Sequence, residues 1–306
     1  MKKVLVTGGM GFIGNHLVHR LLKTGVEVII LDKNIDKPRY YDVQKAKIIE
    51  GDVLSKALLH DLLKEVDTCF HLAALASIAL CERDWLYSHA NNALAFNFLL
   101  DEIRVLGKET KLVYASSAAV YGDCQTLPLD EKVSVHPVSN YGCDKLCNEL
   151  YAGMMSQMAG IHATGLRFFN VYGPGQQPSN PYSGVMSQFK QAILTQQNLM
   201  IYGDGLQTRD FIYVDDVVDA LILAADIDFP ESTVFNICSG EAVTIESLAR
   251  LMLKLTHYDG EVEYLPARAS DLLHSLGKTE LAQKRLGFKA KTNIEDGLKK
   301  FLNDSC

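Results

Sequence analysis

Two polar side chains near the middle of the chain have the types and spacing of an acid–base pair. Tyr141 and Lys145 are four residues apart, which on a helix puts them on one face with about 5 to 6 Å between their Cβ atoms. Lowering a tyrosine pKa from about 10 to about 7 requires about 4 kcal/mol of preference for the phenolate. One positive charge at about 5 Å supplies roughly 3 kcal/mol at an effective dielectric of 20. The pair therefore predicts a phenolate base, although ordinary helix surfaces also carry isolated pairs of this kind.

A glycine-rich turn near the N-terminus predicts a nucleotide site. The apolar run Lys3–Thr7 ends at Gly8, and residues 12–23 then repeat apolar side chains at helical spacing. Glycines at a strand-to-helix turn allow tight packing and close approach of a pyrophosphate, which the N–H groups of the helix N-terminus then face. The residues expected around it are Gly8, Gly11, Phe12, Ile13 and Gly14. The alternative is an ordinary turn between a strand and a helix.

Asp32 narrows the choice of cofactor. It closes the second apolar run, Val26–Leu31, about 20 residues after the glycines. A carboxylate at this place accepts hydrogen bonds from both ribose hydroxyls and repels a 2′-phosphate. We therefore expect NAD rather than NADP.

Short apolar runs alternate with helical stretches in the first half of the chain. Beyond the two runs above, further runs end near Gly51, Leu72, Ser116 and Arg167. This alternation predicts an α/β fold of the Rossmann type, a doubly wound parallel sheet with helices on both faces. A polar, proline-rich stretch after Arg167 indicates a second domain. We expect an NAD-binding domain of residues 1–168 plus about 211–238, and a smaller, discontinuous α/β substrate domain of about 169–210 plus 239–306.

Composition excludes several classes of protein. The 306 residues are 48% apolar and 22% charged, which excludes natively unfolded and collagen-like chains. The net charge of -7 and the lack of a Lys/Arg-rich run argue against nucleic acid or a membrane surface as partner. The seven cysteines form no CxxC pair, so we expect no disulfide framework, no metal site and a cytoplasmic location.

The glycine spacing and several later motifs resemble the extended short-chain dehydrogenase/reductase family, which includes NAD-dependent nucleotide-sugar epimerases and dehydratases. The turn has the spacing Gly-x-x-Gly-x-x-Gly, and the other motifs follow in family order over almost the whole chain. The resemblance implies bound NAD. Besides the glycine turn and Asp32, it assigns to this cofactor Asp52, Val53, Leu72, Ala73, Ala74, Asn91, Ser116, Tyr141 and Lys145.

The resemblance also implies the chemistry. The Tyr141 phenolate removes the proton of the sugar 4-hydroxyl, Lys145 sustains the phenolate, and Ser117 shares a hydrogen bond with that hydroxyl and Tyr141. Carbon 4 gives its hydride to NAD and receives it back on the opposite face of a transient 4-keto sugar. Family members that eliminate water use Asp-Glu after the serine. This chain has Ala118 and Ala119 there, so dehydration is not expected.

Substrate contacts are implied by the same order of motifs. The residues assigned to the nucleotide sugar are Ser117, Asn170, Tyr202, Arg209, Arg268, Asp271 and Ser275. Guanidinium groups suit diphosphate oxygens because they offer paired donors. In UDP-hexose 4-epimerases the position of Ser275 lines the sugar pocket, and a tyrosine there excludes N-acetylated sugars. Serine leaves space for the acetyl group.

These inferences predict an NAD-dependent UDP-N-acetylglucosamine/UDP-N-acetylgalactosamine 4-epimerase, with UDP-glucose and UDP-galactose left open as substrates. The other enzyme interpretations are a UDP-glucuronate 4-epimerase or decarboxylase and a 4-ketoreductase. A non-catalytic NAD-sensing protein is the interpretation from another class. The resemblance also implies a homodimer through helices near 91–105 and 139–158.

Overall fold

The chain folds around a seven-stranded parallel sheet. The computed structural model describes residues 1–36, 39–176, 184–267 and 272–303. The strand order is β10-β6-β5-β4-β1-β2-β3, and every neighbouring pair is parallel. The strands are β1 (Lys3–Thr7), β2 (Glu27–Asp32), β3 (Lys47–Glu50), β4 (Thr68–His71), β5 (Lys111–Ser117), β6 (Ala163–Phe168) and β10 (Thr233–Ile237). Their carboxyl ends meet at one edge, where doubly wound folds bind ligands.

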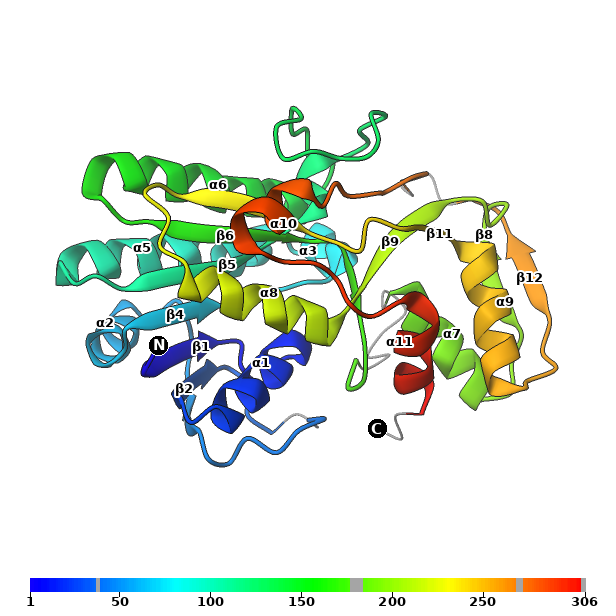
Figure 1. Cartoon of the computed structure of the whole chain (residues 1–306), viewed down its shortest axis with the longest axis horizontal. Coiled ribbons are helices and arrows are strands. Elements are labelled where there is room, and N and C mark those ends of the chain that lie inside the picture. Colours follow the sequence, from blue (N-terminus) through cyan, green and yellow to red (C-terminus); the bar gives the residue numbers. More distant parts are fainter. Residues whose placement is uncertain (37–38, 177–183, 268–271, 304–306) are drawn as a thin grey trace.

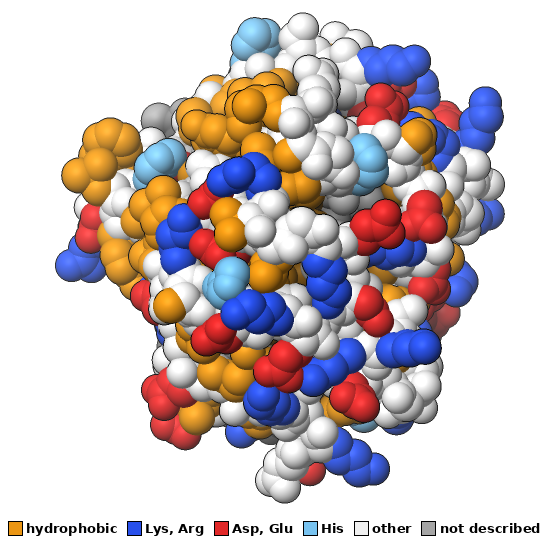
Figure 2. Space-filling model, turned by 90° about the vertical axis from the view of Figure 1, so that its left-hand side faces the viewer, with side chains coloured by type: hydrophobic (Ala, Val, Ile, Leu, Met, Phe, Trp, Pro, Cys, Tyr) orange, Lys and Arg blue, Asp and Glu red, His pale blue; other side chains and the backbone are white. Residues whose placement is uncertain are grey.

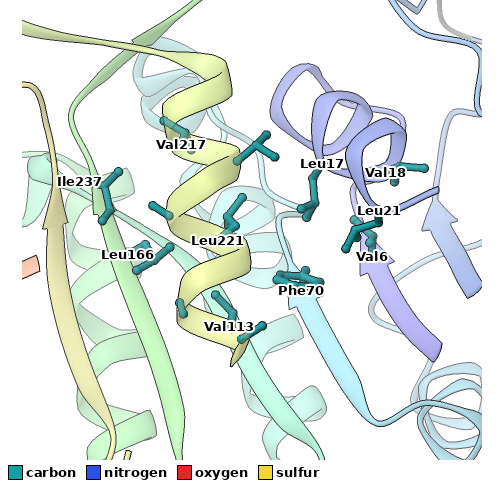
Figure 3. Close-up of a cluster of buried hydrophobic side chains, with 14 of the residues drawn as sticks. Val6, Leu17, Val18, Leu21, Phe70, Val113, Leu166, Val217, Leu221 and Ile237 are labelled. Carbon is teal, nitrogen blue, oxygen red and sulfur yellow. The ribbon is translucent and has the colours of Figure 1, made fainter. Parts of the chain in front are cut away.

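Helices cover both faces of this sheet. One face packs against α1 (Phe12–Lys23), α8 (Val214–Asp226) and α10 (Glu280–Leu286). The other packs against α2 (Lys56–Glu65), α5 (Ala95–Leu106) and α6 (Asn140–Ala159). Central strands are therefore buried on both sides, which explains near-continuous apolar runs such as residues 28–31. Figure 3 shows Leu17 and Leu21 of α1 and Leu221 of α8 packed against strand side chains, among them Val6, Phe70 and Val113.

A smaller part of the chain lies beyond the carboxyl ends of the strands (Figure 1). It contains a three-stranded sheet, β11-β9-β7, and a two-stranded sheet, β12-β8. Its elements are β7 (Asn170–Tyr172), α7 (Val185–Leu194), β8 (Leu199–Tyr202), β9 (Thr208–Tyr213), β11 (Ala242–Thr244), α9 (Ile245–Thr256), β12 (Val262–Leu265) and α11 (Ile294–Leu302). These helices and strands share a hydrophobic core of their own that includes Phe189, Leu248 and Phe301.

Short helical segments follow the ends of β4 and β5. After β4 come α3 (Ile78–Arg83), α4 (Trp85–His89) and a π-helical turn, η1 (Ala90–Leu94). After β5 comes a 3₁₀ turn, η2 (Ala118–Tyr121). Both sets lie at the carboxyl edge of the main sheet. Irregular helical turns of this kind are frequent at functional sites.

The predicted fold class is confirmed: the main sheet is parallel, Rossmann-like and covered on both faces. The domain boundaries stay a prediction. β10 pairs with β6 in the main sheet, and α8 packs on this sheet. α10, which comes from the segment expected in the second domain, packs on the sheet too. In the described part of the chain, we find no helix with the length and apolar character needed to cross a bilayer.

Candidate functional site

The junction between β1 and α1 has no room for a side chain at two of its glycines. Gly8 adopts a φ of +73°, and a Cβ on it would lie 2.6 Å from the backbone nitrogen of Ala73. A Cβ on Gly14 would lie 2.2 Å from the carbonyl oxygen of Gly8, closer than real Cβ atoms approach. The turn therefore needs glycine at both places, and it brings the backbone of β1 against the end of β4.

The first turn of α1 presents unused backbone donors. Gly11 is the N-cap and has no side chain with which to cap the helix. The first helical hydrogen bond runs from the Asn15 N–H to the Gly11 carbonyl (2.8 Å), so the N–H groups of Phe12 and Ile13 have no partner within the helix. This end of α1 also carries the positive end of the helix dipole. The turn thus fits the pyrophosphate of a dinucleotide.

Polar side chains gather at the ends of β2 and β3. Asp32 ends β2, and its carboxylate accepts a hydrogen bond from the Met10 N–H in the glycine turn (3.0 Å). The Lys33 ammonium donates to the Asn91 side-chain oxygen (2.6 Å) and pairs with the Asp52 carboxylate (3.0 Å). Three predicted cofactor residues, Asp32, Asp52 and Asn91, are therefore held at the same edge. Asp32 beside the glycine turn fits an adenosine ribose.

The end of β4 lines this edge as well. The N–H groups of Leu72 and Ala73 donate to the carbonyl (3.0 Å) and the hydroxyl (3.3 Å) of Thr7. Thr7 Oγ1 and His71 Nδ1 lie 2.9 Å apart. Burial, and next the positive charge of Lys145, lower the pKa of His71 to about 3. His71 is therefore a neutral, buried residue near neutral pH.

The predicted catalytic residues of α6 contact the end of β5. The Lys145 ammonium donates to the Ala115 carbonyl (2.8 Å) and lies 5.6 Å from the centre of the Tyr141 ring. The Ser117 side chain also lies near Tyr141 and favours its phenolate form. Ser117 Oγ also accepts from the Ala119 N–H (3.1 Å). The structure thus brings Ser117, Tyr141 and Lys145 together on a strand and a helix of the main fold.

Burial dominates the protonation of this group. It raises the pKa of Tyr141 to about 12, although the nearby Ser117 side chain acts in the opposite direction. It lowers the pKa of Lys145 to about 8, although the neighbouring Asp144 favours the charged form. The expected lowering of the Tyr141 pKa counts the charge of an oxidised nicotinamide besides that of Lys145, so it stays a prediction for the protein with bound cofactor, while burial raises this pKa in the protein alone. The cost of burying a phenolate outweighs the effect of an ammonium that burial itself disfavours.

Glu149 and Arg167 are site residues that the sequence analysis missed. The Ser116 hydroxyl donates to Glu149 (2.5 Å), so this predicted cofactor residue directs its side chain to a carboxylate. Glu149 in turn accepts two hydrogen bonds from Arg167, which lies in a fully buried strand. An arginine within an otherwise apolar strand was the available signal, since such a residue is rarely buried without a partner. A contact between Ser116 and the cofactor stays a prediction.

The predicted substrate residue Asn170 lies close to β5, the strand that carries Ser117. Ser117 is opposite Phe168 in the register of β5 and β6, and Asn170 follows two residues later at the start of β7. Asn170 is exposed. It thus marks the point where the chain passes from the main sheet into the smaller part.

Two further residues that were predicted to bind substrate converge on one carbonyl group. The Arg209 guanidinium and the Ser275 N–H both donate to the Thr208 carbonyl, at 2.9 and 3.1 Å. Ser275 is buried. The Tyr202 carbonyl, at the end of β8, accepts from the Gln207 side chain (2.7 Å). These contacts place Arg209 and Ser275 side by side, with Tyr202 on the preceding strand.

The remaining predicted residues carry less information. Val53 is buried and Ala74 is exposed at the carboxyl edge. Arg268 and Asp271 lie outside the described residues. Within the described ranges, no three His, Cys, Asp or Glu residues are grouped so that they could hold a metal ion.

Comparison with known proteins decides the family. A profile of the NAD dependent epimerase/dehydratase family matches residues 4–238. The chain belongs to this family. As a member of this NAD-dependent epimerase/dehydratase family it is an NAD-dependent enzyme, and the cofactor that the sequence predicted is confirmed.

Members of this family that resemble the chain differ in substrate. A UDP-glucose 4-epimerase of Thermotoga maritima, solved with UDP-glucose, is 33% identical with a TM-score of 0.93 (98% of this chain, 97% of that one). A UDP-N-acetylglucosamine 4-epimerase of Methanobrevibacter ruminantium M1, solved with UDP-N-acetylmuramic acid, is 35% identical with a TM-score of 0.93 and the same coverage. A UDP-N-acetyl-alpha-D-glucosaminuronate decarboxylase of Bacillus cytotoxicus is 34% identical (87% of this chain, 84% of that one).

Replacing Lys145 by methionine should change how stability depends on pH. Burial lowers the pKa of Lys145 from 10.5 to about 8. As the pH rises, the folded protein therefore loses this proton at a lower pH than the unfolded chain does. Between these values the unfolded state binds more protons, so wild-type stability rises with pH. We expect the stability advantage of Lys145→Met over wild type to be largest at pH 7 and to shrink by about 3 kcal/mol toward pH 10.5.

Urea unfolding at several pH values measures this difference. The matched variant Lys132→Met removes one lysine charge from the exposed surface and controls for overall charge. A constant difference between Lys145→Met and wild type from pH 7 to 10.5 would contradict the assignment of a depressed pKa to Lys145.

Proposed function

We propose that the protein is a UDP-N-acetylhexosamine 4-epimerase, which interconverts UDP-N-acetylglucosamine and UDP-N-acetylgalactosamine. The observation that carries the proposal is the convergence of Ser117 and Lys145 on Tyr141 at the carboxyl edge of the sheet. A phenol with a hydroxyl partner and a nearby ammonium suits reversible removal of a proton from an alcohol.

Each of these side chains has a separate task in the proposal. The Tyr141 oxygen takes the proton of the sugar 4-hydroxyl and later returns it. Ser117 Oγ holds the reacting hydroxyl and the phenol in one hydrogen-bonded group, and Lys145 favours the phenolate. Bound NAD would supply a hydride acceptor. The glycine turn and the N-terminus of α1 hold its pyrophosphate, and Asp32 binds its adenosine ribose.

Burial of Tyr141 sets a condition on this mechanism. A phenol whose pKa burial raises to about 12 is almost fully protonated at neutral pH. One ammonium contributes roughly 3 kcal/mol at about 5 Å, so a second positive charge is needed beside the ring. We propose that bound NAD in its oxidised form would supply this charge, so that Tyr141 would be basic only when cofactor is bound.

The chain lacks the groups that family dehydratases use. Ala118 and Ala119 follow Ser117 in η2, and neither carries an acid or a base. Elimination of water needs both, so we propose that the 4-keto sugar is only reduced again. Arg209, together with Arg268, binds the diphosphate, Asp271 binds the nucleotide ribose, and Asn170 and Tyr202 complete the substrate contacts.

Ser275 carries the specificity for the acetylated sugar. It lies beside Arg209, so it borders the sugar if Arg209 binds the diphosphate. A serine side chain leaves space that a tyrosine would fill, and we assign this space to the N-acetyl group. UDP-glucose and UDP-galactose fit the same space with fewer contacts.

Incubation with a panel of UDP-sugars, followed by NMR, tests the proposed activity. We expect interconversion of the two UDP-N-acetylhexosamines without net formation of NADH. Tyr141→Phe removes the acid–base group, so turnover should fall by about 10²- to 10⁴-fold, while NAD binding measured by calorimetry is retained. The proposal would be contradicted if UDP-glucuronate were the only sugar converted, or if Tyr141→Phe turned over substrate as fast as wild type.

A bulky residue at position 275 tests the specificity. We expect Ser275→Tyr to lose about 10-fold or more in kcat/KM for the UDP-N-acetylhexosamines. The tyrosine would exclude the acetyl group from its place, and the loss of these contacts costs about 1.4 kcal/mol or more. UDP-galactose turnover should change less. The control is Leu273→Tyr, which adds the same bulk at an exposed position two residues away. Undiminished N-acetylhexosamine turnover in Ser275→Tyr refutes the role of Ser275.

We also propose that the protein is a homodimer. Leu150, Met154 and Met158 form an exposed apolar row at four-residue spacing on α6, and Val105 of α5 is exposed too. In Figure 2 hydrophobic side chains gather in the upper part of the view, at the height of α6 in Figure 1, and charged side chains of both signs are numerous lower down. Contiguous apolar patches of this kind mark interaction surfaces.

Charged substitutions in this row should separate the subunits. We expect wild-type protein to have twice the chain mass in light scattering, and Leu150→Glu/Met154→Glu to have the monomer mass, because a buried unpaired carboxylate opposes association. The control Leu194→Glu changes an equally exposed leucine on α7. A monomeric wild type contradicts the proposed dimer.

A further inference from the structure

A buried ion pair joins α6 to β6 beneath the catalytic group. The Arg167 guanidinium donates to both carboxylate oxygens of Glu149, at 2.9 and 2.7 Å, and the side chains are only 5% and 7% exposed. Two parallel hydrogen bonds fix the orientation of both groups. Burying this pair costs desolvation energy that an apolar pair would not, so it is weak evidence for a role in stability alone.

The pair holds the chain on both sides of Ser117. Before it, the Ser116 hydroxyl donates to Glu149 (2.5 Å), and Ser116 lies opposite Arg167 in the register of β5 and β6. After it, the Tyr121 hydroxyl accepts from Arg167 (2.8 Å), and its ring lies 4.8 Å from the guanidinium carbon. Ser117 is therefore in a segment anchored at both ends by one ion pair.

The anchored segment is completed by a polar contact from another strand. The Tyr121 hydroxyl donates to the side-chain oxygen of Asn236 in β10 (2.6 Å). The Asn236 side-chain nitrogen donates to the Leu129 carbonyl (2.8 Å). These partners satisfy the groups around the ion pair, as a rigid buried network requires.

Glu149 belongs to the same row of α6 as the catalytic residues. Tyr141, Lys145 and Glu149 follow one another at four-residue spacing, which puts them on one helix face. All three contact consecutive residues of β5: Tyr141 contacts Ser117, Lys145 contacts the Ala115 carbonyl, and Glu149 contacts Ser116. The ion pair thus fixes the strand that carries the serine relative to the helix that carries the tyrosine.

We propose that Glu149 and Arg167 are positioning residues, which keep the Ser117 hydroxyl within hydrogen-bonding reach of Tyr141. This inference rests on the proposed role of Tyr141 as base. The nearby Ser117 side chain favours the phenolate and lowers the pKa of Tyr141, so loosening the network should raise that pKa. A purely structural role would lower the fraction of folded protein without changing this pKa.

Two variants loosen the network to different degrees. Ser116→Ala removes one hydroxyl and leaves the ion pair intact, so it is expected to fold. Glu149→Gln keeps the side-chain shape but leaves Arg167 without its charged partner. The control Asp216→Asn changes a buried carboxylate that accepts from the Lys291 and Thr292 N–H groups (both 3.1 Å) on α8, on the other face of the main sheet.

Ultraviolet titration of the NAD-saturated protein gives the decisive readout. The absorbance change of phenolate formation is recorded for each protein, and that of the same protein carrying Tyr141→Phe is subtracted. We expect the pKa of Tyr141 to rise by roughly half a unit or more in Ser116→Ala, and further in Glu149→Gln. Asp216→Asn should melt at lower temperature than wild type with no change in this pKa.

Steady-state kinetics give the second readout. A misplaced hydroxyl affects the reacting group rather than substrate affinity, so we expect Glu149→Gln to lower kcat by about 10-fold or more with KM within about threefold of wild type. The acidic limb of the kcat profile should move to higher pH in step with the titration.

The outcomes separate this inference from the proposed function. If Ser116→Ala, and Glu149→Gln where it folds, have the Tyr141 pKa and the kinetics of wild type, the positioning role is wrong. The proposed function is not affected by that result. If wild-type protein shows no Tyr141 ionisation below about pH 10 with NAD bound, the base itself is wrong and both proposals fall. The titration needs no sugar, so it tests the positioning role and the Tyr141 base even where the UDP-sugar panel yields no substrate.

Discussion

Burial of a phenol and an ammonium against the end of one strand is the constraint on which this site depends. Burial alone raises the pKa of Tyr141 and lowers that of Lys145, so both groups favour their neutral forms. Converting them into a working base requires a charge partner held at short range by a rigid frame. The parallel sheet supplies that frame because the carboxyl ends of β1, β2, β4 and β5 lie at the same edge of the sheet.

The site is assembled from two kinds of structure. On the side where we propose that the cofactor binds, the structure depends on backbone geometry: glycines that tolerate no Cβ, and a helix N-terminus with unused donors. Side-chain networks hold the reaction side, where the Glu149 and Arg167 pair fixes the segment around Ser117. The first depends on short stretches of chain, whereas the second depends on contacts between distant elements.

This difference explains how far the sequence could be used for prediction. The glycine turn, Asp32 and the four-residue spacing of Tyr141 and Lys145 are local patterns, and the structure brings these residues to the expected edge. The ion pair joins residues 18 positions apart on different elements, and no local pattern pairs them. The sign of the Tyr141 pKa shift was also out of reach, because it depends on burial, which spacing does not report.

The central claim is that Tyr141 moves only the hydroxyl proton, while the hydrogen on carbon 4 leaves and returns as hydride. The most direct measurement is NMR of the product formed from the accepted UDP-sugar in deuterium oxide. Since a hydride does not exchange with solvent, the account predicts that carbon 4 of the product carries no deuterium. Substantial deuterium at carbon 4 would show that this carbon is deprotonated and would contradict the account.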